Sequence, residues 1–162
     1  MMQVRDVMNE EPVAVQATAA VSDAVGLLKE NEISGMPVLE GERLVGVVSE
    51  SDLLKMLSAE REGGLWLPSP LEILEVPIRD LIRWERLQAA AEEAGTTRVS
   101  KIMTKKVFTV GPEDSIQRAA SMMVRHRINR LPVLVEERLV GIVTRGDIIA
   151  GLGMEASEVG ED

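Results

Sequence analysis

The chain of 162 residues contains no cysteine, a single histidine and hardly any aromatic side chains. The absence of cysteine excludes a disulfide framework and thiolate chemistry. The only aromatic residues are Phe108, Trp66 and Trp84, so we expect an aliphatic core in which methionine fills irregular gaps. Neither a Ser-His-Asp triad nor a His/Cys zinc site can be assembled convincingly around one histidine. We interpret His126, which lies between two arginines, as a solvated surface residue.

Several classes of activity find no matching motif in the sequence. There is no GxxxxGK[ST] loop for phosphoryl transfer, and the scattered carboxylates form no motif with acid–base spacing. We therefore predict that the protein is not an enzyme. No stretch approaches the roughly 18 consecutive apolar residues that a membrane span requires, and the amino-terminal MMQVRDVMNE lacks the apolar run of a signal peptide. We expect a soluble, cytoplasmic protein with no membrane partner.

The formal net charge of −9 is distributed unevenly along the chain. A negative protein is a poor match for nucleic acid or anionic membranes, because phosphate groups favour positive faces. We therefore expect no nucleic-acid partner. Residues 4–54 carry three Lys/Arg against ten Asp/Glu, whereas residues 99–149 carry nine against five. A small anion is expected to find a local positive field in the second of these segments.

The two halves of the chain repeat one sequence pattern. A shift of 95 residues aligns 4–54 with 99–149 without a gap, and RLVGVVSESD at 43–52 returns as RLVGIVTRGD at 138–147. Further matches are Val4/Val99, Met8/Met103, Val15/Val110, Ala24/Ala119, Ile33/Ile128, Pro37/Pro132, Val38/Val133 and Leu39/Leu134. Most solenoids need about three or more repeats to be stable. Two repeats therefore indicate a pseudo-twofold pair, each covering the apolar face of the other.

Each half predicts the element order β-α-β-β-α. An extended piece, 13–15 or 108–110, precedes a helix with apolar residues at helical spacing, and Pro112 followed by Glu, Asp and Ser marks the start of the second such helix. Two strands joined by a two-residue hairpin follow, and then a closing helix. These strands and helices are expected at 36–40, 43–49 and 50–60 in the first copy and at 131–135, 138–144 and 145–153 in the second. The predicted fold class is α/β (α+β), with a helical insert between the repeats.

The segment between the copies does not repeat. Pro77 fits the start of a helix and Gly95 its end, and the apolar face between them includes Trp84. This insert is either a strap over the core of the module, or a dimer contact or ligand-sensing gate with Trp66 or Trp84 as its anchor. The predicted domains are repeat 1 at 1–59, linker and amphipathic helical insert at 60–98, repeat 2 at 99–154 and a disordered acidic tail at 155–162.

The repeated motifs resemble those of cystathionine-β-synthase (CBS) domains. The likeness is carried by VRDVM and VSKIM near the start of each copy, by ISGMPV and INRLPV at the first long strand, and by LVGVVSESD and LVGIVTRGD at the end. It covers about two thirds of the chain. The resemblance implies a stand-alone tandem CBS module in which two domains pack through their sheets. It also implies two clefts that bind adenosine-containing ligands, and dimerisation into a flat disc.

Each copy places a hydroxyl residue three positions before an aspartate, at a strand-to-helix junction. Ser49 with Asp52, and Thr144 with Asp147, fit a helix capping box. The same geometry also suits a nucleotide. Free amides and a hydroxyl at a helix start favour a phosphate, whereas the carboxylate can accept hydrogen bonds from the adjacent hydroxyls of a ribose. The resemblance implies the second use for both residues, and capping and binding are compatible.

The second copy is better equipped for an anionic ligand. Arg145 and Arg130 stand where the first copy has Glu50 and Gly35, and a guanidinium can hold phosphate oxygens bidentately. We expect one strong nucleotide site and one site that is weak, takes an uncharged ligand or is vacant, each cleft being lined by both copies. The predicted ligand-binding residues are Thr144, Asp147, Arg145, Arg130, Asn129, Ser49, Asp52, Ile33, Ser34, Pro37, Ile128, Pro132, Val13 and Phe108. Of these, Val13, Ile33, Phe108 and Ile128 are also candidates for simple core residues.

Four functions remain open from the sequence. The first is a regulatory sensor that binds an adenine nucleotide such as AMP, ADP or ATP, with or without Mg, and transmits occupancy to an unidentified effector protein; the resemblance implies that this sensor is a homodimer. The alternatives are a ligand-independent interaction or dimerisation module, and a binder of an S-adenosylmethionine-type ligand. The fourth, an enzyme of nucleotide turnover, would need a base or metal cluster that the sequence does not supply. No cofactor is required, and the adenine nucleotide is a regulatory ligand.

Overall fold

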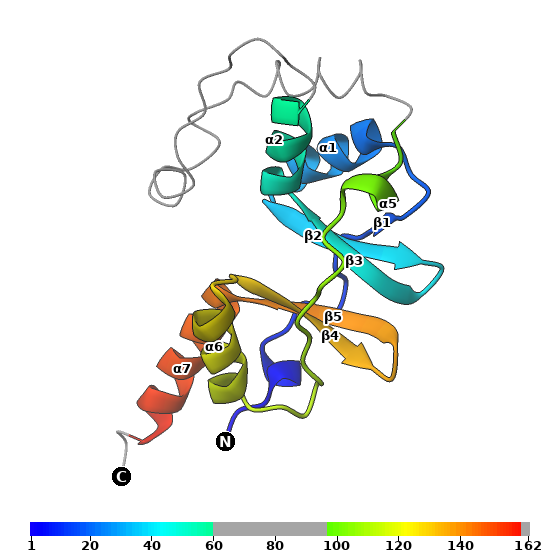
Figure 1. Cartoon of the computed structure of the whole chain (residues 1–162). Helices are drawn as coiled ribbons and strands as arrows, with labels where there is room; N and C mark the ends of the chain where they lie inside the picture. The colour runs from blue at the N-terminus through cyan, green and yellow to red at the C-terminus, as the bar shows by residue number, and fades with distance from the viewer. Residues whose placement is uncertain (60–96, 160–162) are drawn as a thin grey trace. The chain divides into compact units, whose positions relative to one another are not determined.

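The computed structural model of the protein describes residues 1–59 and 97–159 (Figure 1). The first part contains the 3₁₀-helix η1 (Val4–Asp6), β1 (Val15–Gln16), α1 (Val21–Glu30), β2 (Gly35–Glu40), β3 (Arg43–Ser49) and α2 (Glu50–Ala59). The second contains α5 (Val99–Ile102), α6 (Ile116–His126), β4 (Arg130–Val135), β5 (Arg138–Thr144) and α7 (Arg145–Val159). The helix predicted between Pro77 and Gly95, with Trp66 and Trp84, lies outside the described residues.

The mixed α/β class predicted from the sequence is confirmed. The first copy has the predicted order of strand, helix, strand, strand and helix. Its helix α1 buries one face because its apolar residues recur at helical spacing. In the second copy Ser115 caps α6, its Oγ accepting a hydrogen bond from the Arg118 amide at 3.1 Å. The extended piece of this copy forms only an isolated bridge, between Val110 and Val133, where the sequence predicts a strand-like segment.

In the first copy β2 lies between β1 and β3, and in the second copy β4 pairs with β5. β1 runs parallel to β2, with Val15 opposite Val38. β4 and β5 are antiparallel from the pair Arg130/Thr144 to the pair Val135/Arg138. The hairpin turn between them has Glu136 at φ 57°, and Gly41 at the matching place in the first copy has φ 63°. The left-handed conformation at this place explains why the first copy uses glycine there.

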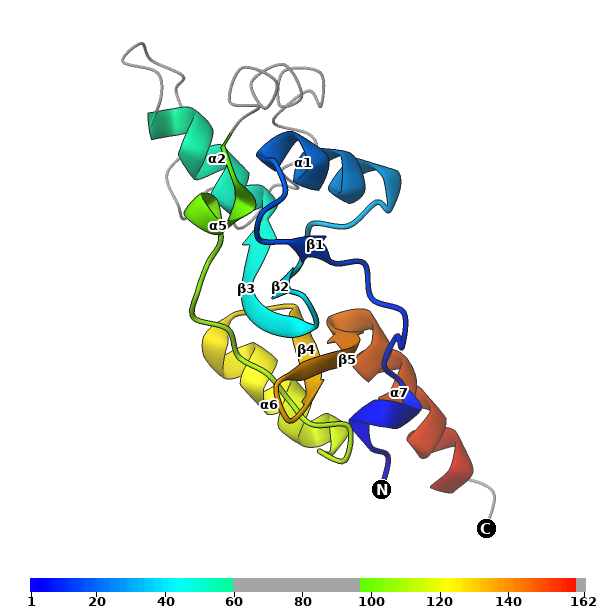
Figure 2. The same ribbon diagram turned by 90° about the vertical axis from the view of Figure 1, so that its right-hand side faces the viewer.

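The chain folds into two compact units that do not coincide with the two sequence repeats. One unit combines residues 1–12 and 42–44 with 106–162, and the other combines 13–41 with 45–105. Within the second of these, α1 and α2 lie on the same side of β2 and β3 (Figures 1 and 2). Within the first, α6 packs against α7. Each repeat therefore contributes its leading segment to the unit formed by the other.

We call residues 3–9 and 98–104 the lead-in segments. Val4 of the first is fully buried in the core of Ile116, Leu131 and Val143, and Val99 of the second is fully buried in the core of Leu28, Val38 and Val48. Each segment then pairs through its backbone with the last strand of that unit, Asn9 with Ile142 and Thr104 with Val47. The exchange thus supplies each core with one buried valine and each sheet with one further backbone pair.

A glycine in each last strand makes room for the lead-in segment. A Cβ built on Gly46 would lie 2.7 Å from the Met103 Sδ and 2.9 Å from the Thr104 carbonyl oxygen. At Gly141 the matching distances are 2.8 Å to Met8 and 2.9 Å to Asn9. Because real Cβ atoms do not approach this closely and the second obstacle is backbone, only glycine fits at either position.

Helix α7 extends farther than the sequence predicts. It continues to Val159 and includes residues 155–159, which the sequence assigns to a disordered tail. Gly151 is buried in the middle of the helix against Val7 and Met2. The Glu155 carboxylate accepts hydrogen bonds from the Met2 amide at 2.5 Å and from the Gln117 side chain at 3.2 Å. These tertiary contacts explain the additional helical turns.

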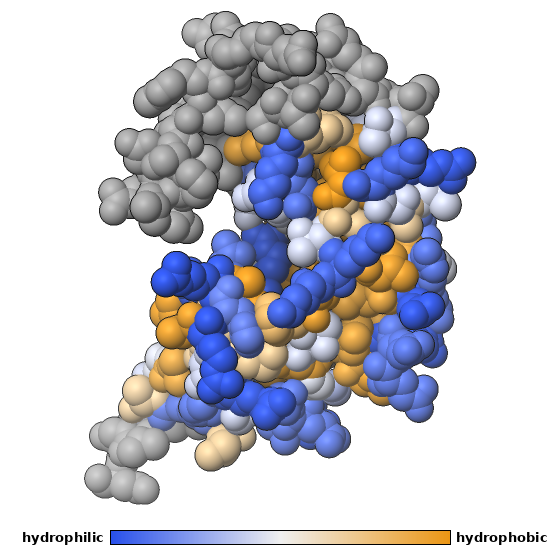
Figure 3. Space-filling view, viewed as in Figure 1, coloured by the Kyte–Doolittle hydropathy of each residue, from blue (hydrophilic) through white to orange (hydrophobic). Residues whose placement is uncertain are grey.

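The surface of α7 combines apolar and polar residues. Ile149, Leu152 and Met154 are exposed by 62%, 41% and 61%, and Figure 3 shows hydrophobic side chains at the surface over this helix. In the part of the chain that the structure describes, no helix has both the length and the apolar character needed to cross a bilayer.

Gly46→Ala is expected to destabilise its unit. The added methyl group must displace either Met103 or the Thr104 backbone, and overpacking of this kind costs about 1–3 kcal/mol. Gly26→Ala, in α1 of the same unit, is the matched control, because nothing lies within 4 Å of its built Cβ and alanine is the better helix former by up to about 1 kcal/mol. Chemical denaturation should show a lower midpoint for the first variant and an equal or higher one for the second. Equal stability of Gly46→Ala and wild type would contradict the close approach of the lead-in segment.

Candidate functional site

Strand β5 passes directly into helix α7 at the junction between Thr144 and Arg145. The Asp147 Oδ2 accepts hydrogen bonds from the Thr144 amide and from the Thr144 hydroxyl, both at 2.8 Å. The Asp147 amide donates to the Thr144 Oγ1 at 3.3 Å. This reciprocal arrangement is a complete capping box, which satisfies an amide that the first turn of the helix leaves unpaired. The structural role predicted for these two residues is therefore present.

Three more of the predicted residues surround this junction. Arg130 pairs with Thr144 across the β4/β5 ladder. The Arg145 amide donates to the Asn129 carbonyl oxygen at 2.9 Å, and the Arg130 Nε donates to the Asn129 Oδ1 at 3.2 Å. The start of β4 and the start of α7 are thereby held side by side. Two guanidinium groups, a hydroxyl and a carboxylate are carried by this one corner of the unit.

Two groups at the corner keep binding capacity. Both hydrogen bonds that the Asp147 side chain accepts end on Oδ2, so its Oδ1 accepts none from the residues that the structure describes. The Arg145 side chain is exposed and forms no ion pair with any carboxylate in residues 1–59 or 97–159. An open carboxylate oxygen can accept from a neutral diol, and an open guanidinium can hold a phosphate. The Thr144 hydroxyl, in contrast, already donates to Asp147.

The matching junction in the first copy is more closed. The Asp52 Oδ2 accepts from the Ser49 amide at 2.9 Å and from the Ser49 hydroxyl at 3.1 Å, and its Oδ1 accepts from the Thr104 hydroxyl at 2.9 Å. Asp52 is only 7% exposed, and Glu50 at the first position of α2 is 6% exposed. The Glu50 amide donates to the Ser34 carbonyl oxygen at 2.9 Å. Both oxygens of this carboxylate are therefore engaged within the protein, and a buried acid replaces the exposed arginine of the other copy.

The predicted apolar wall residues lie at the edges of the two cores. Val13 and Ile33 pack against the core of one unit, and Phe108 and Ile128 against that of the other. Pro37 and Pro132 are buried within β2 and β4. The interpretation of these residues as core is thus supported by their packing, and their role in contacting a base remains a prediction.

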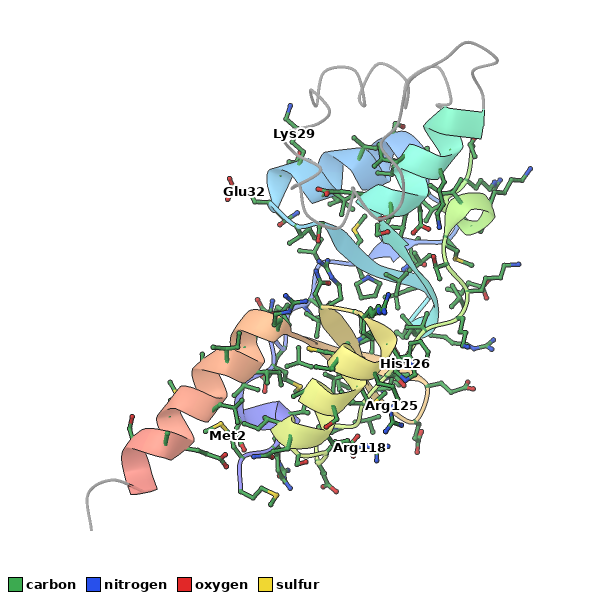
Figure 4. The ribbon with its side chains drawn as sticks, turned by 60° about the vertical axis from the view of Figure 1, so that its left-hand side comes forward. Met2, Lys29, Glu32, Arg118, Arg125 and His126 are labelled. Carbon is green, nitrogen blue, oxygen red and sulfur yellow. The ribbon has the colours of Figure 1, made fainter. Side chains whose placement is uncertain are left out.

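The interpretation of His126 as a solvated surface residue is wrong, because its side chain is half-buried. Its ring stacks on that of Phe108, with 3.6 Å between the centroids and 17° between the planes. The Lys106 Nζ lies 5.5 Å from the centroid of Phe108. Figure 4 shows His126 at the end of α6, where the chain turns back toward β4. No sequence pattern indicates this contact, because the two rings are eighteen positions apart and Phe108 lies outside the helices and strands. One face of Phe108 is consequently covered within its own unit.

The fourteen predicted residues are divided between the two units, eight in one and six in the other. One unit holds Phe108, Ile128, Asn129, Arg130, Pro132, Thr144, Arg145 and Asp147; the other holds Val13, Ile33, Ser34, Pro37, Ser49 and Asp52. Each unit thus carries its own set, related to the other by the shift of 95 residues. A cleft lined by both sets remains a prediction. No cluster of three or more His, Asp or Glu able to hold a metal ion occurs among residues 1–59 and 97–159.

Comparison with known proteins identifies both repeats. The family model described as CBS domain matches residues 4–59 and again residues 99–153. An uncharacterized protein of Methanocaldococcus jannaschii, MJ1426, is 40% identical over 154 residues, which cover 93% of this chain and 91% of that protein.

Solved structures agree with this assignment. AcuB of Vibrio cholerae superposes with a TM-score of 0.71 at 26% identity, covering 100% of this chain and 99% of that one. CBSX2, solved in complex with AMP, superposes with a TM-score of 0.69 at 26% identity, covering 96% and 99%. The resemblance seen in the sequence is confirmed.

Removal of the two carboxylates should affect stability unequally. Asp147→Ala is expected to cost about 1 kcal/mol, as the loss of a helix cap usually does. Asp52→Ala should cost more, about 2 kcal/mol, because it removes a carboxylate that is only 7% exposed and that accepts hydrogen bonds from the Ser49 amide, the Ser49 hydroxyl and the Thr104 hydroxyl. Ser51→Ala, an exposed neighbour in the first turn of α2, should change little. Denaturant titration of the three variants measures the order, and a larger loss for Asp147→Ala than for Asp52→Ala would contradict the hydrogen bonding described above.

Proposed function

This chain belongs to the CBS domain family and carries two CBS repeats, and from that premise we propose that it is a regulatory sensor of an adenine nucleotide. The ligand binds at the β5/α7 junction. The observation that carries the proposal is the open Asp147 Oδ1 beside the exposed Arg145. CBSX2, which has the same fold, has been solved with AMP, and this supports an adenosine-containing ligand.

Each part of the ligand has a chemical counterpart at the junction. The ribose hydroxyls donate to the Asp147 carboxylate, whose negative charge excludes the phosphate from the same position. The phosphate is directed to Arg145, Arg130 and the amino-terminal end of α7, where the helix dipole is positive. An Asp and an Arg that lie two positions apart can thus separate the neutral and the anionic parts of one nucleotide.

Occupancy is transmitted through helix α7. A diol that binds the open Oδ1 shares its carboxylate with the cap of this helix, which uses Oδ2, so binding acts on the first turn. Farther along, Gly151 packs on Met2 and Val7, and Glu155 holds the Met2 amide. A shift at the first turn would therefore reach the lead-in segment 3–9 and the exposed face of α7. An effector protein that reads this face completes the sensor.

The ligand class is tested by calorimetric titration with AMP, ADP, ATP and S-adenosylmethionine. Micromolar binding corresponds to about −8 kcal/mol. Asp147→Ala should weaken binding by about tenfold to a hundredfold, since it removes hydrogen bonds to a charged group worth about 1.5–3 kcal/mol. Asp52→Ala should leave the strong site unchanged.

A comparison of AMP with adenosine separates the two recognition elements. Arg145→Ala should weaken AMP and leave adenosine unchanged, because only AMP carries the phosphate. Asp147→Ala should weaken both. Preference for S-adenosylmethionine over every nucleotide would replace the ligand but keep the site. The absence of heat with all probes would leave the ligand-independent interaction module as the function.

That second candidate is favoured by the exposed apolar residues of α7. Ile149 and Leu152 lie one turn apart on this helix and are 62% and 41% exposed, an arrangement typical of a surface that binds another protein chain. We propose that this face assembles two copies into a homodimer. Ile149→Glu should shift the molar mass measured by light scattering from dimer to monomer, whereas Arg125→Glu, at an exposed position of α6, should not. A wild-type protein that is monomeric at micromolar concentration would refute the homodimer.

A further inference from the structure

The two capping aspartates differ in one hydrogen bond. The Asp52 Oδ1 accepts from the Thr104 hydroxyl at 2.9 Å, and the Asp147 Oδ1 accepts from none of the described residues. Thr104 does not belong to the repeat that contains Asp52. It is the last residue of the lead-in segment 98–104, and it reaches Asp52 because the two lead-in segments are exchanged between the units.

Asn9 holds the corresponding position in the other unit. The Asn9 amide donates to the Ile142 carbonyl oxygen at 2.8 Å and its carbonyl oxygen accepts from Ile142 at 3.0 Å. Thr104 makes the same two bonds with Val47, at 2.8 and 3.0 Å. The backbones are therefore placed alike, and the difference lies in the side chains alone.

The Asn9 side chain is committed elsewhere. Its Oδ1 accepts a hydrogen bond from the Glu11 amide at 3.0 Å, a local turn that holds the amide group at its own backbone. Thr104 has a short hydroxyl on Cβ, and it donates directly to the carboxylate. The side chain at this position consequently decides whether the neighbouring aspartate keeps an open oxygen.

We propose that the residue at the end of each lead-in segment selects which repeat binds the ribose. This selection rests on the proposed function. The Thr104 hydroxyl takes the place of a ligand hydroxyl at the Asp52 Oδ1, whereas Asn9 leaves the Asp147 Oδ1 open to the ligand. A ligand that enters the first-copy site must first displace an internal donor. A ligand that enters the second-copy site meets an unoccupied oxygen.

The charge of the neighbouring residues points in the same direction but acts on a different part of the ligand. Glu50 in the first copy opposes a phosphate and Arg145 in the second favours it. Neither residue distinguishes an uncharged diol. Adenosine is therefore the probe that isolates the effect of Thr104 and Asn9 from that of the charges.

The test is calorimetric titration of the full chain with adenosine. The Asp147→Ala variant, whose second-copy site is disabled, provides the background. The double variant Asp147→Ala/Thr104→Val should bind adenosine at least about tenfold more tightly than Asp147→Ala alone, because the Thr104 hydroxyl no longer competes for the Asp52 carboxylate. Thr104→Ser is the matched control, because it keeps the hydroxyl and should keep the site closed. Adding Asp52→Ala to Thr104→Val should abolish the gain.

The reciprocal exchange is made at Asn9. In the otherwise wild-type chain, Asn9→Thr should weaken adenosine at the second-copy site about tenfold, whereas Asn9→Val, which lacks the hydroxyl, should bind as wild type does. Melting curves without ligand check that all variants are folded.

The outcomes separate this inference from the proposed function. Binding that depends on Asp147 but is the same for Thr104→Val and Thr104→Ser, and for Asn9→Thr and Asn9→Val, overturns the role of the lead-in residue and leaves the sensor intact. Wild-type protein that binds neither adenosine nor AMP overturns both. A gain from Thr104→Val together with a loss from Asn9→Thr establishes the selection.

Discussion

The close contact between each lead-in segment and a glycine of the opposite repeat is the constraint on which the rest of the structure depends. With no Cβ at Gly46 or Gly141, a methionine and a backbone carbonyl of the lead-in segment approach within 3 Å of the place where a Cβ would lie. That approach puts Val99 and Val4 into the two cores and aligns the backbone pairs that follow. It also delivers Thr104 to Asp52. The packing of the cores, the backbone pairing and the hydrogen bonds of the site all depend on the absence of a Cβ at Gly46 and Gly141.

Much of the fold could be predicted from the sequence, because the repeat doubles every local signal. The hairpin strands and the start of each closing helix follow from period, turn residues and capping residues that appear in both copies. The exchange of the lead-in segments could not be predicted in this way. Val4 and Val99 match each other in the repeat, but a local pattern does not say which core a residue enters. Gly46 and Gly141 were the available signal, since a glycine inside a strand indicates that another backbone passes close to it.

The site was predictable in its residue types and not in its hydrogen bonds. The hydroxyl three positions before an aspartate fits a cap and a ligand equally well, and the structure contains the cap in both copies. The copies differ in whether the Oδ1 of the capping aspartate accepts a hydrogen bond within the protein. That bond depends on the side chain of Thr104 or Asn9, each of which lies more than fifty positions from its aspartate in the sequence. The stacking of His126 on Phe108 escaped prediction for the same reason. Long helix α7 also required tertiary contacts, those of Gly151 and Glu155, to continue past its glycines.

A duplicated module begins with two equal sites, and here the differences between the copies act together. Replacement of an acid by Arg145 changes the charge offered to a phosphate, and the side chain at the end of the lead-in segment changes the oxygen offered to a ribose. These are independent interactions with separate parts of a nucleotide, so their free energies add to a first approximation. Both favour the second copy. The first copy then has a fully satisfied, buried carboxylate, which contributes more to stability than an open one does, and the second gives up part of that stability for the capacity to bind.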